Sequence, residues 1–501
     1  MPDADITSII PIVITLGLSL STRNVVIGLF AGVVSAVIML VGFNPLDVMT
    51  TLVKEHLVTT LSDSYNAGVI VLLVFIGGFV TLMEKSGGGP AFALTIVRRI
   101  SSKGRAQFAA WCGGIFIFYS DLGTPLIVGP VFRPLFDKLK LSRQKLAFIV
   151  DSTASPVAIL VPFIGWGIYI ISLIQKEFDS AGQDISAWDS FIQAMPFQFY
   201  ALLAIFIVPV LIYAGLDFGP MAEAEKTANR SSQQTISNKN EDNIQAFTHS
   251  KARASFVFIP LLIMATVLCA TLIPLGFPFE KVAGSTFRAA LTSAYFFAAM
   301  TLMLMMAYYG VRTLTEGISL YIQGMGNMMQ VAIVLILAWT FSGLGKDLGT
   351  ATYIAEQAQQ GFPYWLLPAV AFVLSAIISF STGSSWGTFA IMFPLMIPTA
   401  FAIDASLVVS IGAVLSGGLF GDHCSPISET TILSSTGSGC NQFEHFKTQL
   451  PYALTNGSIA LCCFIFAGFN PHIYWIFIAL AAQISILYLI AKTKPLKWQK
   501  T

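Results

Sequence analysis

The sequence predicts an all-α polytopic membrane protein with about eleven transmembrane helices and two re-entrant helical hairpins in an inverted-topology repeat. Only 11% of its 501 residues are charged, against about 25% in soluble domains, and 55% are hydrophobic. Apolar stretches of roughly 15–23 residues recur along the chain, which favours helices over the short alternating strands of a porin. These observations place the chain in a lipid bilayer.

Eleven segments are apolar enough to be spanning helices: 6–20, 24–42, 68–83, 145–174, 197–216, 254–274, 286–308, 325–343, 407–424, 449–469 and 473–491. The first follows an acidic start, whereas a signal peptide begins with basic residues, so we expect a retained helix. Regions 107–136 and 364–402 each hold two short apolar halves around a polar centre, YSDLGTP and STGSSWGT. Because crossing the hydrocarbon core takes about 20 helical residues, we expect each region to be a re-entrant hairpin.

Basic residues gather on one side of this layout. The other side keeps only five of the 27, namely Lys54, Lys176, Lys281, Arg288 and Lys346. By the positive-inside rule, the rich side is cytoplasmic. We therefore expect a multi-pass protein of the cytoplasmic (inner) membrane, with its N-terminus outside and its C-terminus in the cytoplasm.

Two halves of the chain share a pattern. Gly123-Thr124 precedes Pro130 and Pro134 at the spacing with which Gly387-Thr388 precedes Pro394 and Pro398, and polar breaks with Ser-Pro follow at 151–156 and 422–426. We expect a first repeat over 1–216 (hairpin 107–136, broken helix 145–174), a flexible cytoplasmic linker over 217–253, a second repeat over 254–469 (hairpin 364–402, broken helix 407–440), and an extra C-terminal helix and tail over 470–501. Inverted repeats with broken helices indicate a secondary transporter.

Four acidic residues lie at membrane depth in this layout: Asp121, Asp151, Asp422 and Glu429. A carboxylate there costs about 2.5–3.5 kcal/mol and usually serves function, although each could instead cap a broken helix. Hydroxyl groups accompany them at the tips and breaks: Ser120, Thr124, Ser152, Thr153, Ser155, Thr382, Ser384, Ser385, Thr388 and Ser425. Because such oxygens suit a hard cation, we expect Asp121, Asp151 and Asp422 to bind Na⁺. His423 is either a proton carrier or a neutral histidine hydrogen-bonded to the break.

The stretch GDHCSPISETTILSSTGSGCNQFEHFKTQLPYAL (421–454) resembles the hallmark of the NhaC-type Na⁺/H⁺ antiporter family, within the ion transporter superfamily. STGSSWGT (381–388) and KLAFIVDSTASPVA (145–158) are similar to it as well. The resemblance implies cation-coupled exchange, usually of Na⁺ for H⁺, with some relatives also exchanging organic acids, and a homodimer by analogy. The first tip, YSDLGTP, departs from the family pattern, which leaves stoichiometry and substrate open.

The expected function is exchange of Na⁺ for H⁺ by alternating access, with Asp422 and Glu429 exchanging a proton for a cation. The alternative is a Na⁺- or H⁺-coupled carrier of a small organic anion or amino acid; a passive channel would not need paired titratable groups. The sequence contains no HExxH, Walker A or GxSxG motif, so we expect no enzyme. The expected partners are the bilayer, Na⁺ and protons, with no cofactor and no nucleic acid.

Overall fold

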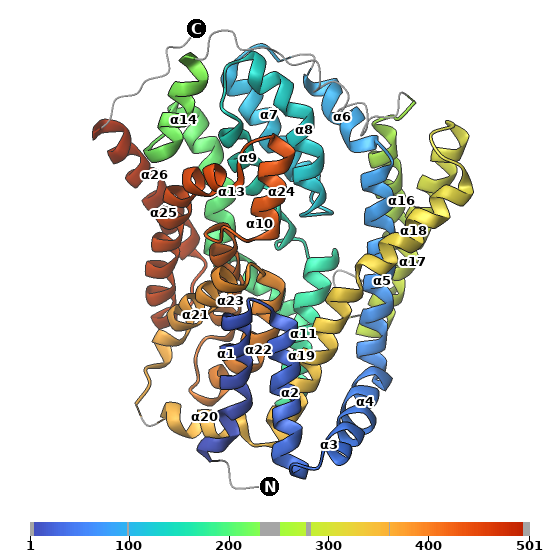
Figure 1. Ribbon diagram of the computed structural model, residues 1–501, viewed down its shortest axis with the longest axis vertical. Helices are drawn as coiled ribbons and strands as arrows, with labels where there is room; N and C mark the ends of the chain where they lie inside the picture. The colour runs from blue at the N-terminus through green and yellow to red at the C-terminus, as the bar shows by residue number, and fades with distance from the viewer. Residues whose placement is uncertain (1–4, 98–99, 231–250, 277–281, 360, 494–501) are drawn as a thin grey trace.

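The structure is a computed structural model that describes residues 5–97, 100–230, 251–276, 282–359 and 361–493. Within these ranges every regular element is a helix (Figure 1). Eight of the described helices are long and apolar enough to cross a membrane, or up to ten if each of two bent pairs is one span. The predicted helical polytopic class is confirmed. Straight spans are fewer than eleven because some apolar segments, such as Leu407–His423, are short.

The first group of helices runs from the N-terminus to the first hairpin. It comprises η1 (Ile6–Ile9), α1 (Ile10–Thr22), α2 (Val25–Val41), α3 (Pro45–Thr51), the π-helical η2 (Leu52–Leu57), α4 (Val58–Ser62), α5 (Ser64–Lys85) and α6 (Gly88–Val97). The chain bends by 111° between α2 and the helical segment Pro45–Ser62. That segment was not predicted, because Asp47, Lys54 and Glu55 interrupt any spanning pattern in it.

The first hairpin consists of α7 (Lys103–Phe116) and α8 (Gly123–Lys138), which pack against each other. The helix after it is broken into α9 (Arg143–Asp151), α10 (Ser155–Ala158) and α11 (Gly165–Ser180). Ser142 starts α9 by accepting a hydrogen bond from the backbone of Lys145, which satisfies one of the free donors of the first turn. The break falls in the polar DSTASP stretch.

Four elements connect the first broken helix to the second half: α12 (Ala187–Ala194), η3 (Met195–Phe197), α13 (Phe199–Ala214) and α14 (Gly219–Arg230). Helix α14 corrects the prediction of a flexible linker over 217–253, because Met221 and Glu225 are buried in it. The Glu225 carboxylate accepts hydrogen bonds from the backbone N and Oγ of Ser142, at 2.8 and 2.6 Å. Residues 231–250 of the predicted linker lie outside the described residues.

The second half contains the longer outer helices and the second hairpin. Its elements are α16 (Ser255–Leu272), η4 (Ile273–Leu275), α17 (Gly284–Tyr308), α18 (Leu314–Asn327), α19 (Met329–Asp347), α20 (Thr350–Gln359), η5 (Tyr364–Leu366), α21 (Leu367–Thr382), α22 (Ser385–Ala402), α23 (Leu407–His423), α24 (Glu429–Ser438), α25 (Gln442–Phe469) and α26 (Tyr474–Thr493). Gly383 turns the tip between α21 and α22 with a φ of +66°, which glycine adopts without strain.

The hairpins and broken helices pack in a reciprocal way. Helix α8 contacts α9 of its own half and α24 of the other, while α22 contacts α23 of its own half and α11 of the other. Each hairpin therefore meets the first part of its own broken helix and the last part of the opposite one. Two inverted repeats would pack in this way. The proposed repeat boundaries, 1–216 and 254–469, stay predictions.

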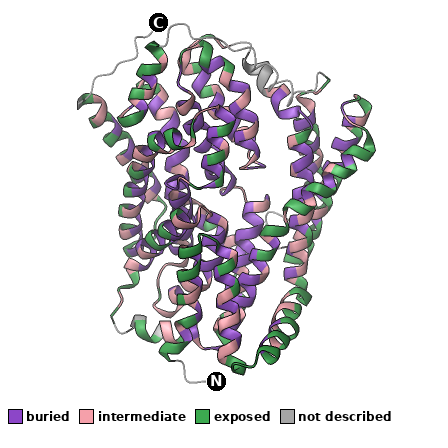
Figure 2. Ribbon diagram, in the orientation of Figure 1, coloured by how far each residue is buried: buried purple, intermediate pink, exposed green. Residues whose placement is uncertain are grey.

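Exposed residues lie along the outer helices (Figure 2), and many of them are large apolar residues. Phe297 on α17 and Phe477 on α26 are both more than half exposed. Only 17% of the apolar stretch of α26 is buried inside the protein. Lipid tails solvate such surfaces, whereas water would not. The chain is therefore a multi-pass membrane protein.

Candidate functional site

Helix α24 of the second half lies directly against the first hairpin. A Cβ atom on Gly437 would lie 2.2 Å from the carbonyl oxygen of Pro125, and one on Gly129 would lie 2.6 Å from the carbonyl carbon of Gly437. Backbone therefore touches backbone between α8 and α24, which only glycine permits. This contact holds the break before α24 near the breaks and tips of the other elements (Figure 1).

Asp151, the last residue of α9, is completely buried and bound by three side chains of the second half. Its carboxylate lies 2.6 Å from Nε2 of Gln449, 3.1 Å from Oγ of Ser434 and 3.3 Å from Nε2 of His445. A carboxylate that serves as the common acceptor of three donors has the hydrogen bonding of an ionised group. Asp151 is thus a well-compensated charge at the contact between the halves.

Asp422, beside the end of α23, is also buried, at 3% exposure, but it is compensated less. Its Oδ2 accepts a hydrogen bond of 2.6 Å from Oγ1 of Thr430, whose hydroxyl lies 3.0 Å from Oγ of Ser428. Across the described residues no basic side chain lies within salt-bridge distance of Asp422. A carboxyl group buried with so little compensation favours holding either a proton or a cation.

Gln449 connects the two breaks. Its Nε2 donates to Asp151 and also lies 3.2 Å from the backbone oxygen of His423. Nδ1 of His423 lies 3.0 Å from the hydroxyl of Tyr200 on α13. The histidine ring is thus held by a side chain rather than by the broken backbone. Its other ring nitrogen, Nε2, is buried without a hydrogen-bond partner in the described part of the chain.

Asp121 occupies the first tip, between α7 and α8, and is partly exposed. The preceding hydroxyl, Oγ of Ser120, donates to Oε1 of Glu84 at 2.7 Å and accepts from the backbone of Gly123 at 2.8 Å. Glu84, on α5, therefore fixes the tip that carries Asp121.

Most of the predicted hydroxyl groups support the tips and breaks. Thr124, Thr153, Thr382 and Thr388 donate to backbone oxygens of their own segments, Ser384 caps α22, and Ser425 donates to the backbone oxygen of Phe380 at 2.8 Å. Ser152, Ser155 and Ser385 are buried. Within the described chain the Oγ of Ser155 has no hydrogen-bond partner. These groups hold the tips and breaks in place and leave their oxygen lone pairs free.

The structure corrects three expectations. Asp151, which was expected to be a Na⁺ ligand, is instead bound by side chains of the second half. Glu429, the first residue of α24, is exposed, and in the described part of the chain no hydrogen bond joins it to Asp422. The carboxyl of Glu177 on α11 is buried at 3% exposure, although its place near a helix end made it look like a loop residue.

The sequence interpretation also missed His445, Gln449 and Ser434, the partners of Asp151. All three lie inside the 421–454 stretch that carries the family resemblance. His445 and Gln449 are four residues apart on α25 and so share one helix face. A polar pair at this spacing in an apolar helix could have indicated an inward-facing contact.

The three expected carboxylate ligands do not form one cage. Among the described residues no three His, Cys, Asp or Glu side chains converge as ligands of a metal ion. A cation would instead use one carboxylate with neighbouring hydroxyl and carbonyl oxygens, such as Asp422 with Thr430 and Ser428. That donor set, one charge with neutral oxygens, suits a monovalent hard cation.

A helical membrane protein with two re-entrant hairpins, two broken helices and buried carboxylates at the breaks is a secondary transporter. The model of the Na⁺/H⁺ antiporter family matches residues 4–170 and 157–469. The chain belongs to this family, as the 421–454 stretch predicted.

Relatives and a solved structure agree with this assignment. A Haemophilus influenzae protein without a functional name is 30% identical over 98% of this chain and 96% of its own. The Bacillus subtilis Na⁺/H⁺ antiporter NhaC is 31% identical over 29% of this chain and 32% of its own, and the malate-2H⁺/Na⁺-lactate antiporter of that organism is 25% identical over 30% and 32%. The structure of Neisseria gonorrhoeae MtrF, described with a class of antimetabolite efflux pumps, matches 85% of both chains with a TM-score of 0.60 and 15% identity, which shows a shared fold.

Proposed function

We propose that this protein exchanges Na⁺ for H⁺ by alternating access. The observation that carries the proposal is Asp422, which is buried at a helix break with hydroxyl partners and no basic side chain beside it among the described residues. Such a group can hold a proton or a sodium ion, but not both at once. That competition is sufficient for obligatory exchange.

The two buried aspartates have different duties in this proposal. Asp151 already has three donors, so binding a cation there would break existing hydrogen bonds. The carboxylate of Asp422 accepts fewer hydrogen bonds and can still accept a ligand, and the hydroxyls of Thr430 and Ser428 offer further oxygens. Asp151 therefore anchors the contact between the halves while Asp422 exchanges its ligand. Asp121, at the neighbouring tip, contributes negative charge along the ion path.

Family membership supports ion-coupled transport. The names of the relatives support two kinds of transported substrate, inorganic ions and small organic acids. One relative is an Na⁺/H⁺ antiporter, and another exchanges malate and protons for sodium and lactate. Helices α8, α11, α22 and α24 all begin at tips or breaks, and their partially positive N-terminal ends would favour a carboxylate ligand. The second candidate is therefore a Na⁺- or H⁺-coupled carrier of a small organic anion or amino acid.

The distribution of basic residues supports a particular membrane and a particular orientation of the chain in it. We place the protein in the cytoplasmic membrane with its N-terminus outside and its C-terminus in the cytoplasm, because this orientation keeps the basic loops inside. Na⁺ and protons are the transported ions, and the mechanism needs no cofactor. A homodimer stays a prediction.

The test uses purified protein in liposomes that contain a pH-sensitive dye. Addition of Na⁺ outside should raise the internal pH, and the same addition to liposomes carrying Asp422→Asn should not. Asp404→Asn, at an exposed turn, serves as the matched control and should behave as wild type. Absence of proton movement in wild type between about pH 6 and 9 would contradict antiport. Na⁺-dependent uptake of labelled malate, lactate or amino acids in its place would establish the second candidate.

A further inference from the structure

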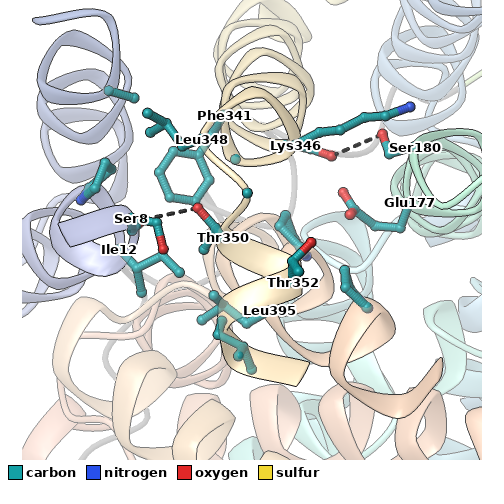
Figure 3. Close-up of a pocket in the computed structure, with 18 of the residues that line it drawn as sticks. Ser8, Ile12, Glu177, Ser180, Phe341, Lys346, Leu348, Thr350, Thr352 and Leu395 are labelled. Carbon is teal, nitrogen blue, oxygen red and sulfur yellow. Dashed lines mark hydrogen bonds between the residues drawn. The ribbon is translucent and has the colours of Figure 1, made fainter. Parts of the chain in front are cut away.

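A cavity lies away from the helix breaks, at the end of the molecule that contains the N-terminus. Its volume is about 270 Å³, and its walls come from η1, α1, α2, α11, α19, α20 and α22. Most of the lining is apolar, including Phe341, Leu348 and Leu395. The Glu177 side chain points into the cavity from α11, and Figure 3 shows its carboxylate turned toward the centre.

Hydroxyl groups line the cavity together with this carboxylate. Ser342 of α19 and Ser180 of α11 belong to its wall, and their hydroxyls lie 3.4 Å apart. Lys346 also lines the cavity, but its ammonium group extends away from the carboxylate (Figure 3). Lys176, the neighbour of Glu177 in the chain, is partly exposed. Apart from the Lys346 side chain, the wall therefore offers one negative charge and neutral hydroxyl oxygens among apolar side chains.

The size of the cavity restricts what it can hold. A volume of 270 Å³ equals about nine water molecules at 30 Å³ each. A bare sodium ion is far too small to fill it, whereas an ion with part of its water shell fits. The apolar walls weaken screening and so strengthen the attraction of the carboxylate for a cation.

Helix α11 links this cavity to the helix breaks. Trp166 lies at the start of α11, directly after the first break, and Glu177 follows eleven residues later on the same helix. Eleven residues make about three helical turns, so both side chains share one face about 16 Å apart. The same helix packs against α22, which starts at the second tip and ends at this cavity. Helices α11 and α22 thus run side by side from the first break and the second tip to the cavity.

We propose that the cavity around Glu177 is an outer binding site for a partly hydrated monovalent cation, through which Na⁺ reaches the exchange site. Glu177 supplies the charge, and Ser342 and Ser180 supply neutral oxygens. The site is separate from Asp422 and would bind Na⁺ when Asp422 cannot. The inference rests on the proposed sodium coupling for its role in transport, but binding itself can be measured without transport.

The test measures equilibrium binding of ²²Na⁺ to the full-length purified chain. In an Asp422→Asn background, saturable Na⁺ binding should remain, and adding Glu177→Gln should abolish it. Asp347→Asn is the matched control, because Asp347 is exposed at the same end and does not line the cavity. Loss of transport in the Asp422 variant with retained Na⁺ binding separates this proposal from the proposed exchange.

Two results would overturn the proposal. Either the Asp422→Asn variant binds no Na⁺, or its binding is unchanged by Glu177→Gln. Gel filtration shows whether Glu177→Gln folds. If it does not, Ser342→Ala in the same background is tested in its stead, because this variant keeps the Glu177 carboxylate. It should raise the half-saturating Na⁺ concentration about threefold, and an unchanged value would contradict the assigned site.

Discussion

His445 of α25 lies 3.3 Å from the carboxylate of Asp151 of α9, and neither side chain is exposed. The contact joins residues 294 positions apart and fastens the second half of the chain to the break in the first. It therefore makes the break in the first half part of the contact between the two halves.

Removing the histidine should destabilise the protein strongly. His445→Ala leaves a buried carboxylate with one donor fewer, and losing a hydrogen bond to a charged group costs about 1.5–3 kcal/mol. His445→Gln can still donate and should recover part of the loss. Thermal unfolding in detergent measures both variants, with the exposed His472→Ala as control. Equal melting temperatures for His445→Ala and wild type would show that the pair contributes nothing.

The backbone contact between α8 and α24 predicts a steric effect. Gly437→Ala places a methyl group 2.2 Å from the Pro125 carbonyl oxygen, which forces the helices apart. Overpacking of this kind costs about 1–3 kcal/mol, although alanine otherwise favours a helix. Gly326→Ala on α18 has nothing within 4 Å and should be neutral or stabilising. Chemical denaturation compares the two, and equal effects would remove the argument for close packing.

Glu225 of α14 predicts a pH-dependent stability. Burial raises the pKa of its carboxyl above the ordinary 4.5, and the nearby Asp217 acts in the same direction, against the opposing hydrogen bonds from Ser142. A raised pKa means that the stabilising contribution is full below pH 4.5 and is lost as the pH rises through the folded-state value. Glu225→Gln cannot ionise, so its stability relative to wild type should increase with pH.

Melting temperatures between pH 4.5 and about 8 check this expectation. Glu223→Gln, an exposed site on the same helix, controls for the loss of one negative charge. A difference between Glu225→Gln and wild type that stays constant with pH would refute the assignment to Glu225.

The sequence predicted the hairpins and breaks because Gly-Thr, Ser-Pro and isolated acids are local signals in an apolar chain. Both hairpins fall in the predicted regions, although the two arms of the second, Tyr364–Thr382 and Ser385–Ala402, are each long and apolar enough to cross a membrane. Helices α9 and α23 end at or next to Asp151 and Asp422. The partners of those acids are not local. Asp151 meets Gln449 across 298 positions, and only the packing of α25 against α9 brings them together.

Two misreadings have a common cause. Glu177 and Glu225 lie at or beyond the ends of apolar segments, where a charge is normally solvated, and only tertiary packing buries them. Hydropathy assigns each residue to a segment but does not report what covers that segment. The same limit explains why α14 looked like a flexible linker.

The central claim is that Asp422 exchanges a proton for Na⁺, and the most direct measurement is proton release on Na⁺ binding to purified protein in weakly buffered detergent solution. The account predicts that Na⁺ releases protons from wild type and none from Asp422→Asn, while Asp404→Asn releases as many as wild type. Undiminished proton release from Asp422→Asn would contradict the account and assign the exchange to another group.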